Sequence, residues 1–256
     1  MIKLTRPPKP QELTSDEEQR LTQEYQDDGK SVWREDYIVD ALLTMSHKKC
    51  AYCERQVAKG SPTFHIDHYH PKSLYKSEVV AWHNLLPACS DCNTQKGKHD
   101  TKASPILNPT HDVPKQFLRM KHYRIAGIDA DGIGTRTREV LGLNNPIHDR
   151  RTELGQQILV QVTLFRQELR EYEGKRDLRQ STKSRLVTRL LTILAEGQPR
   201  KEYSAAVATV LLENDEFQEV CRFMKGFNLW SAEIQELYSL LEENALNTRI
   251  NDDSIT

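Results

Sequence analysis

Apolar residues in the second half of the chain recur at steps of three and four, which is the spacing of one face of an α-helix. The clearest run is Leu154, Ile158, Val162, Phe165, Leu169 and Tyr172. It predicts a long amphipathic helix that begins soon after Arg151. Shorter runs predict further helices over 182–196, 200–213, 215–225 and 231–246. Ser231 is the expected N-cap of the last one, and NDDSIT at the end should fray.

The first half of the chain has weaker periodicity and more turn-forming residues. Residues 1–14 are proline-rich and should be extended. A helix is predicted over 16–27, with Ser15 as its N-cap and Gly29 as its stop, and a second helix over 34–45. Short alternating runs around Asp131-Gly132 predict a β-hairpin within HYRIAGIDADGIGT.

These patterns divide the chain into four parts. They are an N-terminal arm with two helices (1–46), a cysteine- and histidine-rich segment (47–103), a connector with the hairpin (104–150) and a helical region (151–256). The expected fold class is α+β and mostly α, with a small metal-centred module embedded in a helical protein.

Composition makes this a polar chain of 256 residues, with 37% hydrophobic residues and a mean hydropathy of −0.69. No apolar run approaches the roughly 18 to 20 residues of a membrane span, and MIKLTRPPKPQ lacks the apolar core of a signal peptide. We therefore expect a cytoplasmic protein. The net charge is −1, yet basic residues outnumber acidic ones between Thr44 and Ser104, which favours that segment as the face for an anion.

Four of the five cysteines form two C-x-x-C pairs, Cys50 with Cys53 and Cys89 with Cys92. In a reducing compartment such pairs are metal ligands more often than disulfides. Two such turns make a closed tetrahedral zinc site, which is structural because no coordination position is left for a substrate. The alternative is four unrelated buried cysteines. Cys221 lies in an apolar helical pattern and is expected to be a small core residue.

Between and after the zinc turns lie FHIDHYHPKS, WHNLLPAC and CNTQKGK. In this order the elements resemble the HNH endonuclease family, whose ββα-metal core is often braced by a four-cysteine zinc; the resemblance covers roughly residues 48–100. It implies that His68 is the general base, that Asp67 and Asn93 hold Mg²⁺ or Mn²⁺, and that Asn84 orients the base. A histidine suits this role because its ordinary pKa lies near 6.5.

Other polar residues of the segment have two interpretations each. Lys72, Lys96 and His70 are candidates for contacts to a substrate phosphate, and each is as readily a solvated surface residue. His65 stands two residues before Asp67, so on a regular strand it shares that face and is a possible third ligand of the catalytic ion. Its alternative is a partly exposed polar residue.

A wider resemblance extends over about residues 2–150 through KLTRPPKPQEL, ILNPTHD and LGLNNPIHDRR. These segments resemble the PtuB-type HNH nucleases of Septu and Septu-like retron anti-phage systems. That resemblance implies a partner ATPase, PtuA, and in retron versions a reverse transcriptase with its branched DNA–RNA. The chain has no phosphate-binding G-x-x-x-x-G-K-[ST] loop of its own. Residues 151–256 would be a docking platform, or simply the protein's own core.

The sequence is thus interpreted as a metal-dependent HNH endonuclease, the effector of an anti-phage defence complex. A polynucleotide is the substrate, with DNA favoured. Two alternatives stay open: cleavage of a host RNA such as tRNA, and a zinc-containing nucleic-acid-binding module without catalysis.

Overall fold

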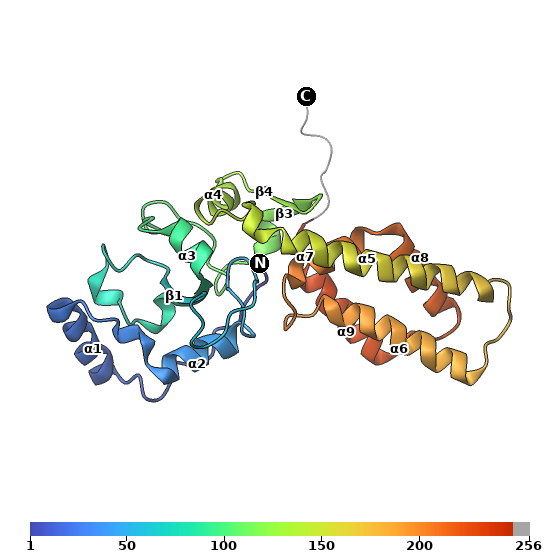
Figure 1. Cartoon of the computed structure of the whole chain (residues 1–256), viewed down its shortest axis with the longest axis horizontal. Helices are drawn as coiled ribbons and strands as arrows, with labels where there is room; N and C mark the ends of the chain where they lie inside the picture. The colour runs from blue at the N-terminus through green and yellow to red at the C-terminus, as the bar shows by residue number, and fades with distance from the viewer. Residues whose placement is uncertain (248–256) are drawn as a thin grey trace, which may run out of the picture. The chain divides into compact units, whose positions relative to one another are not determined.

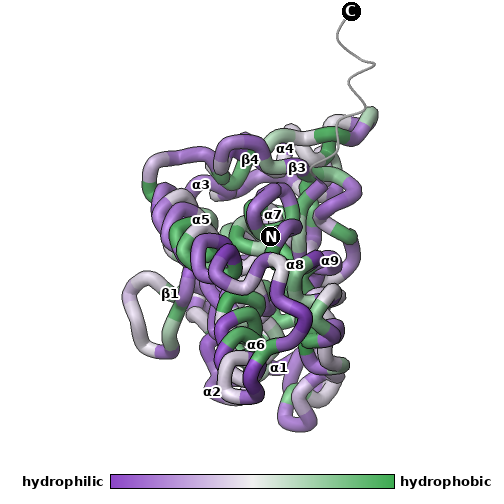
Figure 2. Tube along the Cα trace, turned by 90° about the vertical axis from the view of Figure 1, so that its right-hand side faces the viewer, coloured by the Kyte–Doolittle hydropathy of each residue, from purple (hydrophilic) through white to green (hydrophobic). Residues whose placement is uncertain are grey.

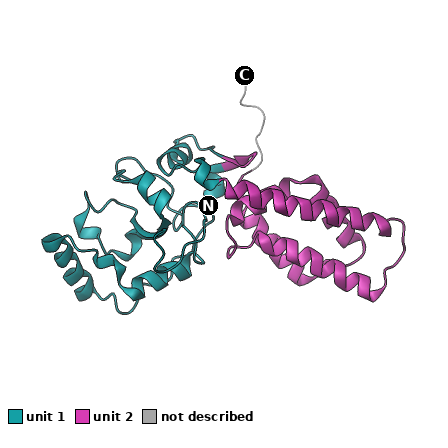
Figure 3. Cartoon of the chain, in the orientation of Figure 1, with its two compact units in different colours: residues 1–118, 125–148 teal, residues 119–124, 149–256 magenta. Residues whose placement is uncertain are grey.

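The computed structural model describes residues 1–247 (Figure 1). The chain divides into two units: unit 1 comprises 1–118 and 125–148, and unit 2 comprises 119–124 and the chain from 149 onward (Figure 3). The prediction that NDDSIT frays lies outside the described residues. None of the helices within residues 1–247 combines the length and apolar character that a membrane span requires.

The helices of unit 1 are short, and their bounds are α1 Ser15–Asp28, α2 Asp36–Met45, α3 Ser90–Lys96 and α4 Ile133–Val140. The N-cap of α1 is Thr14 rather than Ser15, because the Thr14 hydroxyl accepts the Glu17 N–H. Gly29 ends α1 in the left-handed region (φ 67°), as predicted. Helix α2 begins later than expected because a 3₁₀ turn, η1 Val32–Arg34, comes before it.

Two strands and one helix form the centre of unit 1. Strand β1 Phe64–His68 pairs antiparallel with β2 Leu85–Cys89, and α3 follows β2 directly and packs on both strands. Successive side chains of a strand point to opposite faces, so Phe64, Ile66 and His68 share one face. His65 and Asp67 share the other, which faces α3. The α+β, mostly helical fold class with a ββα unit beside the cysteines is therefore confirmed.

The predicted hairpin lies earlier than its sequence signal. Strands β3 Leu118–Lys121 and β4 Arg124–Gly127 form a second two-stranded sheet. Their turn is made by His122 and Tyr123, both at positive φ (47° and 61°), as the tightest hairpin turns require.

Asp131-Gly132, where the turn was expected, leads into helix α4 instead. Gly132 is the N-cap residue, at φ 69°. The carboxylate of Asp129 accepts the N–H groups of Ile133 and Gly134 at 2.6 and 2.7 Å. This side-chain cap satisfies the free amides of a helix start, so the Asp-Gly pair begins a helix rather than joining two strands.

Unit 2 is a bundle of helices, with bounds α5 Arg150–Leu169, α6 Gln180–Glu196, α7 Ser204–Glu213, α8 Asp215–Gly226 and α9 Ala232–Asn244. The predicted helices are confirmed, as is Ser231, whose hydroxyl accepts the Ile234 N–H. Helix α7 is buried along most of its length and packs against α5 and α9. Apolar and polar stretches alternate along α5 (Figure 2). Cys221 is 4% exposed, a core residue as expected.

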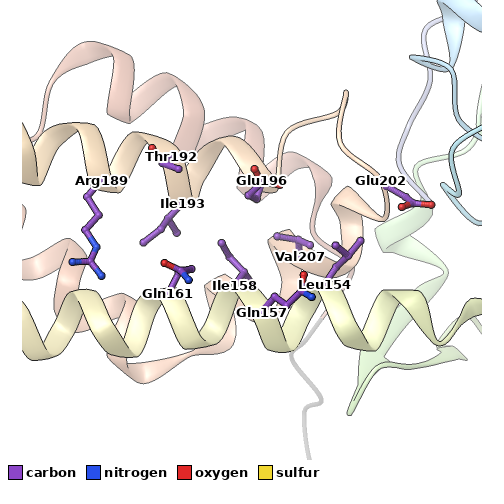
Figure 4. Close-up of a pocket in the computed structure, with 10 residues that line it drawn as sticks. All are labelled: Leu154, Gln157, Ile158, Gln161, Arg189, Thr192, Ile193, Glu196, Glu202 and Val207. Carbon is purple, nitrogen blue, oxygen red and sulfur yellow. The ribbon is translucent and has the colours of Figure 1, made fainter.

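Helices α5 and α6 leave a cavity between them. Side chains of both helices line it (Figure 4), and its volume is about 490 Å³. Ile158, Ile193 and Val207 supply apolar lining, whereas Gln157 and Gln161 supply amides.

Candidate metal centre and active site

The four paired cysteines come together in unit 1. Cys50 and Cys53 belong to the turn after α2, Cys89 ends β2, and Cys92 lies in the first turn of α3. Their sulfur atoms all lie within 4.8 Å of one another, and Cys53 Sγ is 3.6 Å from Cys89 Sγ. Zn–S bonds of about 2.3 Å in a tetrahedron place sulfur atoms about 3.8 Å apart. All four side chains are buried and none is in a disulfide, so the cluster fits one zinc ion.

Within the cluster, the contacts of Cys89 favour its thiolate form. The thiols of Cys50, Cys53 and Cys92 hydrogen-bond to its sulfur and lower the pKa of Cys89 well below its ordinary value. The Cys92 N–H also donates to the same sulfur at 3.4 Å, which makes Cys89 the N-cap of α3. Metal ligation requires deprotonated sulfur, and these contacts favour that form.

His68 is held in one protonation state by a backbone contact. Its Nε2 lies 2.8 Å from the carbonyl oxygen of Val79. A carbonyl only accepts, so Nε2 carries the hydrogen and the neutral ring leaves Nδ1 with a lone pair. The ring packs edge-on against Trp33, with centroids 4.7 Å apart. Burial lowers the pKa of His68 to about 4, because it disfavours the charged imidazolium, so the ring is neutral at pH 7 with its lone pair at Nδ1.

Asn84 is fully buried and fastens the loop that follows β1. Its Nδ2 donates to the carbonyls of His70 (3.1 Å) and Glu78 (3.2 Å), and its Oδ1 accepts the His70 N–H at 2.6 Å. Glu78 precedes Val79, so Asn84 fixes the backbone beside the carbonyl to which His68 donates. The amide thus fastens the backbone next to the Val79 carbonyl and does not itself contact the imidazole.

Asp67 lies inside the module with both carboxylate oxygens occupied. Oδ1 accepts from Lys96 Nζ at 2.9 Å, and Oδ2 accepts from the Tyr52 hydroxyl at 2.6 Å. Lys96 Nζ also donates to the His68 carbonyl at 2.6 Å. Lys96, predicted to contact a phosphate, is instead 2% exposed and its ammonium is bonded to protein groups. An ion on Asp67 would have to share this carboxylate with Tyr52 and Lys96.

His65 and Asn93 meet on the α3 face of β1. Asn93 Nδ2 lies 3.0 Å from His65 Nδ1, and Asp67 shares that face. A carboxylate, an amide and an imidazole are donors that Mg²⁺ or Mn²⁺ accepts. Within residues 1–247, however, the four cysteines are the only group of three or more His, Cys, Asp or Glu donors close enough to hold one ion. The assignment of Asp67 and Asn93, with His65 as a third ligand, therefore stays a prediction.

The two other candidates for phosphate contact have different surroundings. Lys72 Nζ lies over the Trp33 ring, 5.0 Å from its centroid, and Trp33 in turn touches His68. Partial burial lowers the pKa of Lys72. His70 Nδ1 lies 2.8 Å from the Thr101 hydroxyl, which donates to the Tyr69 carbonyl. His70 Nδ1 therefore carries the hydrogen in this contact. Lys72 is the candidate that the fold brings beside His68.

Sequence reasoning missed Tyr52 and Trp33. Tyr52 stands between two cysteines of the cluster in CAYC, and its ring is fully buried. Trp33 lies in the 3₁₀ turn η1, outside the segment that carries the resemblance. An aromatic residue inside a zinc turn was the only local signal for Tyr52. No signal in the sequence pairs Trp33 with a histidine 35 positions away.

Replacing Lys96 with methionine is expected to destabilise unit 1 by about 3 to 5 kcal/mol, because it leaves the buried carboxylate of Asp67 without its countercharge. The double variant with Asp67→Asn should recover part of this loss, since no buried charge is left unpaired. Urea unfolding measures both, with Lys98→Met, an exposed lysine on the same segment, as the control. If the Lys96→Met protein is as stable as the control, the ion pair of Lys96 with Asp67 does not stabilise the fold by this amount.

Comparison with known proteins adds two findings. The family model of the HNH endonuclease matches residues 50–99, which hold all four zinc cysteines, His68 and Asn84. A Septu protein PtuB of Bacillus thuringiensis is 39% identical over 250 residues, which cover 96% of this chain and 95% of that protein. No solved structure matches the chain. With an HNH endonuclease domain and this identity over nearly the whole of both chains, the protein belongs to the PtuB family of Septu proteins.

Proposed function

We propose that the protein is a metal-dependent endonuclease that hydrolyses phosphodiester bonds, with His68 as the general base. The observation that carries this proposal is the His68–Val79 hydrogen bond, which places the ring hydrogen on Nε2 and leaves Nδ1 unprotonated. A neutral imidazole with Nδ1 unprotonated can take a proton from the attacking water at neutral pH. The Val79 carbonyl, fixed through Asn84, keeps the ring in that tautomer.

The other residues of the site would bind the metal ion and the substrate phosphate. Asn93 and Asp67, with His65 as a third ligand, would hold a divalent ion. Such an ion supplies positive charge against the phosphate and the leaving oxygen. Lys72, whose ammonium lies over the Trp33 ring, would contact a neighbouring phosphate oxygen. The zinc cluster holds the end of β2 and the start of α3, and so positions Asn93.

A cleavage assay tests the proposal. Plasmid DNA, single-stranded DNA and tRNA are incubated with the zinc-loaded protein, with its partner present and absent. Cleavage should require added Mg²⁺ or Mn²⁺ and should stop at EDTA doses too mild to release zinc, which metal analysis of the same samples checks. DNA is the expected substrate, and selective tRNA cleavage would favour the RNA alternative. Binding of all three without cleavage under any condition would favour the non-catalytic module.

We further infer that unit 2 supplies much of the docking surface for an ATPase of the PtuA type. Support comes from the family membership and from α5, where Val160 (55% exposed) and Leu164 (47%) present apolar side chains one helical turn apart. The name of the relative favours a Septu system over a retron with its reverse transcriptase. Co-expression with the neighbouring ATPase gene should give a stable complex that Val160→Asp weakens. Failure to co-purify would remove the partnership and leave the nuclease proposal standing.

A further inference from the structure

A groove of about 530 Å³ runs beside β1 in unit 1. Its lining includes Arg34, the loop 59–62 and the β1 residues Phe64, His65 and Ile66. Phe64 and Ile66 share the β1 face that carries His68, because side chains alternate along a strand. Two of the three β1 residues in the lining therefore belong to the strand face that carries the proposed general base.

The groove offers an aromatic ring and an unpaired positive charge. Phe64 is half-buried, so part of its ring faces the groove. Arg34 is exposed, and within residues 1–247 its guanidinium has no hydrogen-bond or ion-pair partner. Lys59, the other cation of the lining, is paired with two carboxylates, Asp36 at 2.9 Å and Asp40 at 2.8 Å, and Asp36 also lines the groove. Arg34 is thus the groove's available ligand for an anion.

Two residues of the groove lining adjoin, along the chain, residues that lie at His68. Arg34 follows Trp33 in η1, and the Trp33 ring packs on His68. Phe64 lies four residues before His68 on β1, a distance of about 13 Å at the usual rise of a strand. Stacked nucleotides are about 3.4 Å apart along one strand. A nucleotide in the groove would therefore lie within a few positions of a phosphate at His68.

We propose that this groove binds an unpaired nucleotide of the substrate, with its base stacked on Phe64 and an adjacent phosphate on Arg34. Both faces of a base inside a duplex are covered by its neighbours, so the ring can receive only a base that is free of the stack. The inference rests on the proposed nuclease function. It adds a substrate class, namely single-stranded nucleic acid or a strand with an unpaired base near the cleaved bond.

Fluorescence anisotropy on the full chain tests the groove without cleavage, in a His68→Ala background and without added divalent ions. The probes are labelled oligo(dT), oligo(U) and a DNA duplex of the same length. Phe64→Leu keeps an apolar side chain but removes the ring, and should weaken single-strand binding about 5-fold or more. Arg34→Ala should also weaken it and lower the slope of log affinity against log salt by about 0.7.

Two matched variants in unit 1 serve as controls: Phe117→Leu at another half-buried phenylalanine, and Arg20→Ala, an exposed arginine of α1. Neither should change single-strand affinity, and Phe64→Leu should leave duplex affinity unchanged. Weaker binding of either oligomer by Phe64→Leu supports the proposal, and the oligomer affected shows whether the groove binds DNA or RNA. Unchanged single-strand affinity in Phe64→Leu, an equal loss with the duplex, or no binding of either oligomer by the parent would overturn it. If the variants bind single strands more weakly but the wild-type chain cleaves no nucleic acid, only the nuclease proposal is wrong.

Discussion

Replacing His68 with alanine should reduce strand cleavage by about 10² to 10⁴-fold, the usual contribution of a general base. His68 is 4% exposed, so alanine also leaves the Val79 carbonyl without its donor and the Trp33 ring without its neighbour. His68→Gln separates these effects, because the glutamine amide can still donate to Val79 yet has no basic nitrogen. Both variants should lose cleavage to a similar extent, as measured by single-turnover assays on labelled DNA.

Two further variants sharpen this test. His83→Ala removes an exposed histidine next to Asn84 and should cleave like the wild type. Asn84→Ala should slow cleavage less than His68→Ala, because Asn84 acts through the loop and leaves the imidazole in place. Zinc content should equal that of the wild type in all four proteins. Full cleavage, or full phage protection, by His68→Gln would rule out His68 as the base.

The helices of unit 2 were predictable because their signals are local. Steps of three and four in apolar residues locate α5 to α9 to within a few residues, and a C-x-x-C pair is a turn with two ligands whatever surrounds it. The misplaced hairpin shows the limit of a local signal. Asp131-Gly132 is typical of a tight turn, but the Asp129 cap two residues earlier makes the same Gly132 a helix start.

The sequence motifs predicted which residues form the candidate site, but not which groups those residues contact. Lys96 looks like a surface lysine in CNTQKGK, and only the packing of α3 on β1 turns its ammonium onto Asp67. The Val79 carbonyl that fixes the tautomer of His68 has no sequence signature, since every residue has a carbonyl. Such contacts join segments far apart in the chain, and periodicity and motif spacing do not encode them.

The N-terminal arm gives a second example. Its proline-rich sequence predicts extended chain, and residues 1–10 are free of regular structure. Arg6 nevertheless donates to the carbonyls of Trp82 and Leu85, which flank Asn84 in the chain, at 2.7 and 3.0 Å. Burial lowers the pKa of Arg6 to about 10. An extended arm is thus part of the support of the segment around Asn84, although its composition is that of a solvated tail.

Replacing Cys89 with serine is expected to unfold unit 1 rather than to inactivate a folded protein. Apparent zinc-binding energies of about 10 to 16 kcal/mol are comparable to the whole stability of a typical domain, about 5 to 15 kcal/mol. Cys89 contributes to three features at once, as a member of the four-cysteine cluster, as the last residue of β2 and as the N-cap of α3. The wild type should contain about one zinc per chain, and Cys89→Ser should contain none and be largely insoluble.

The matched control is Cys221→Ala in unit 2, which removes a buried thiol that is not part of the cluster. It should remain soluble with one zinc, because it costs only a small core side chain. Since the helices of unit 2 pack around their own core, limited proteolysis after strong chelation should cut within unit 1 first and leave a resistant fragment that begins near residue 149. We expect zinc to hold together the strands and the helix that carry His68 and Asn93, and not unit 2. Two results would contradict this expectation: soluble Cys89→Ser protein with normal zinc content, or the unfolding of both units together on chelation.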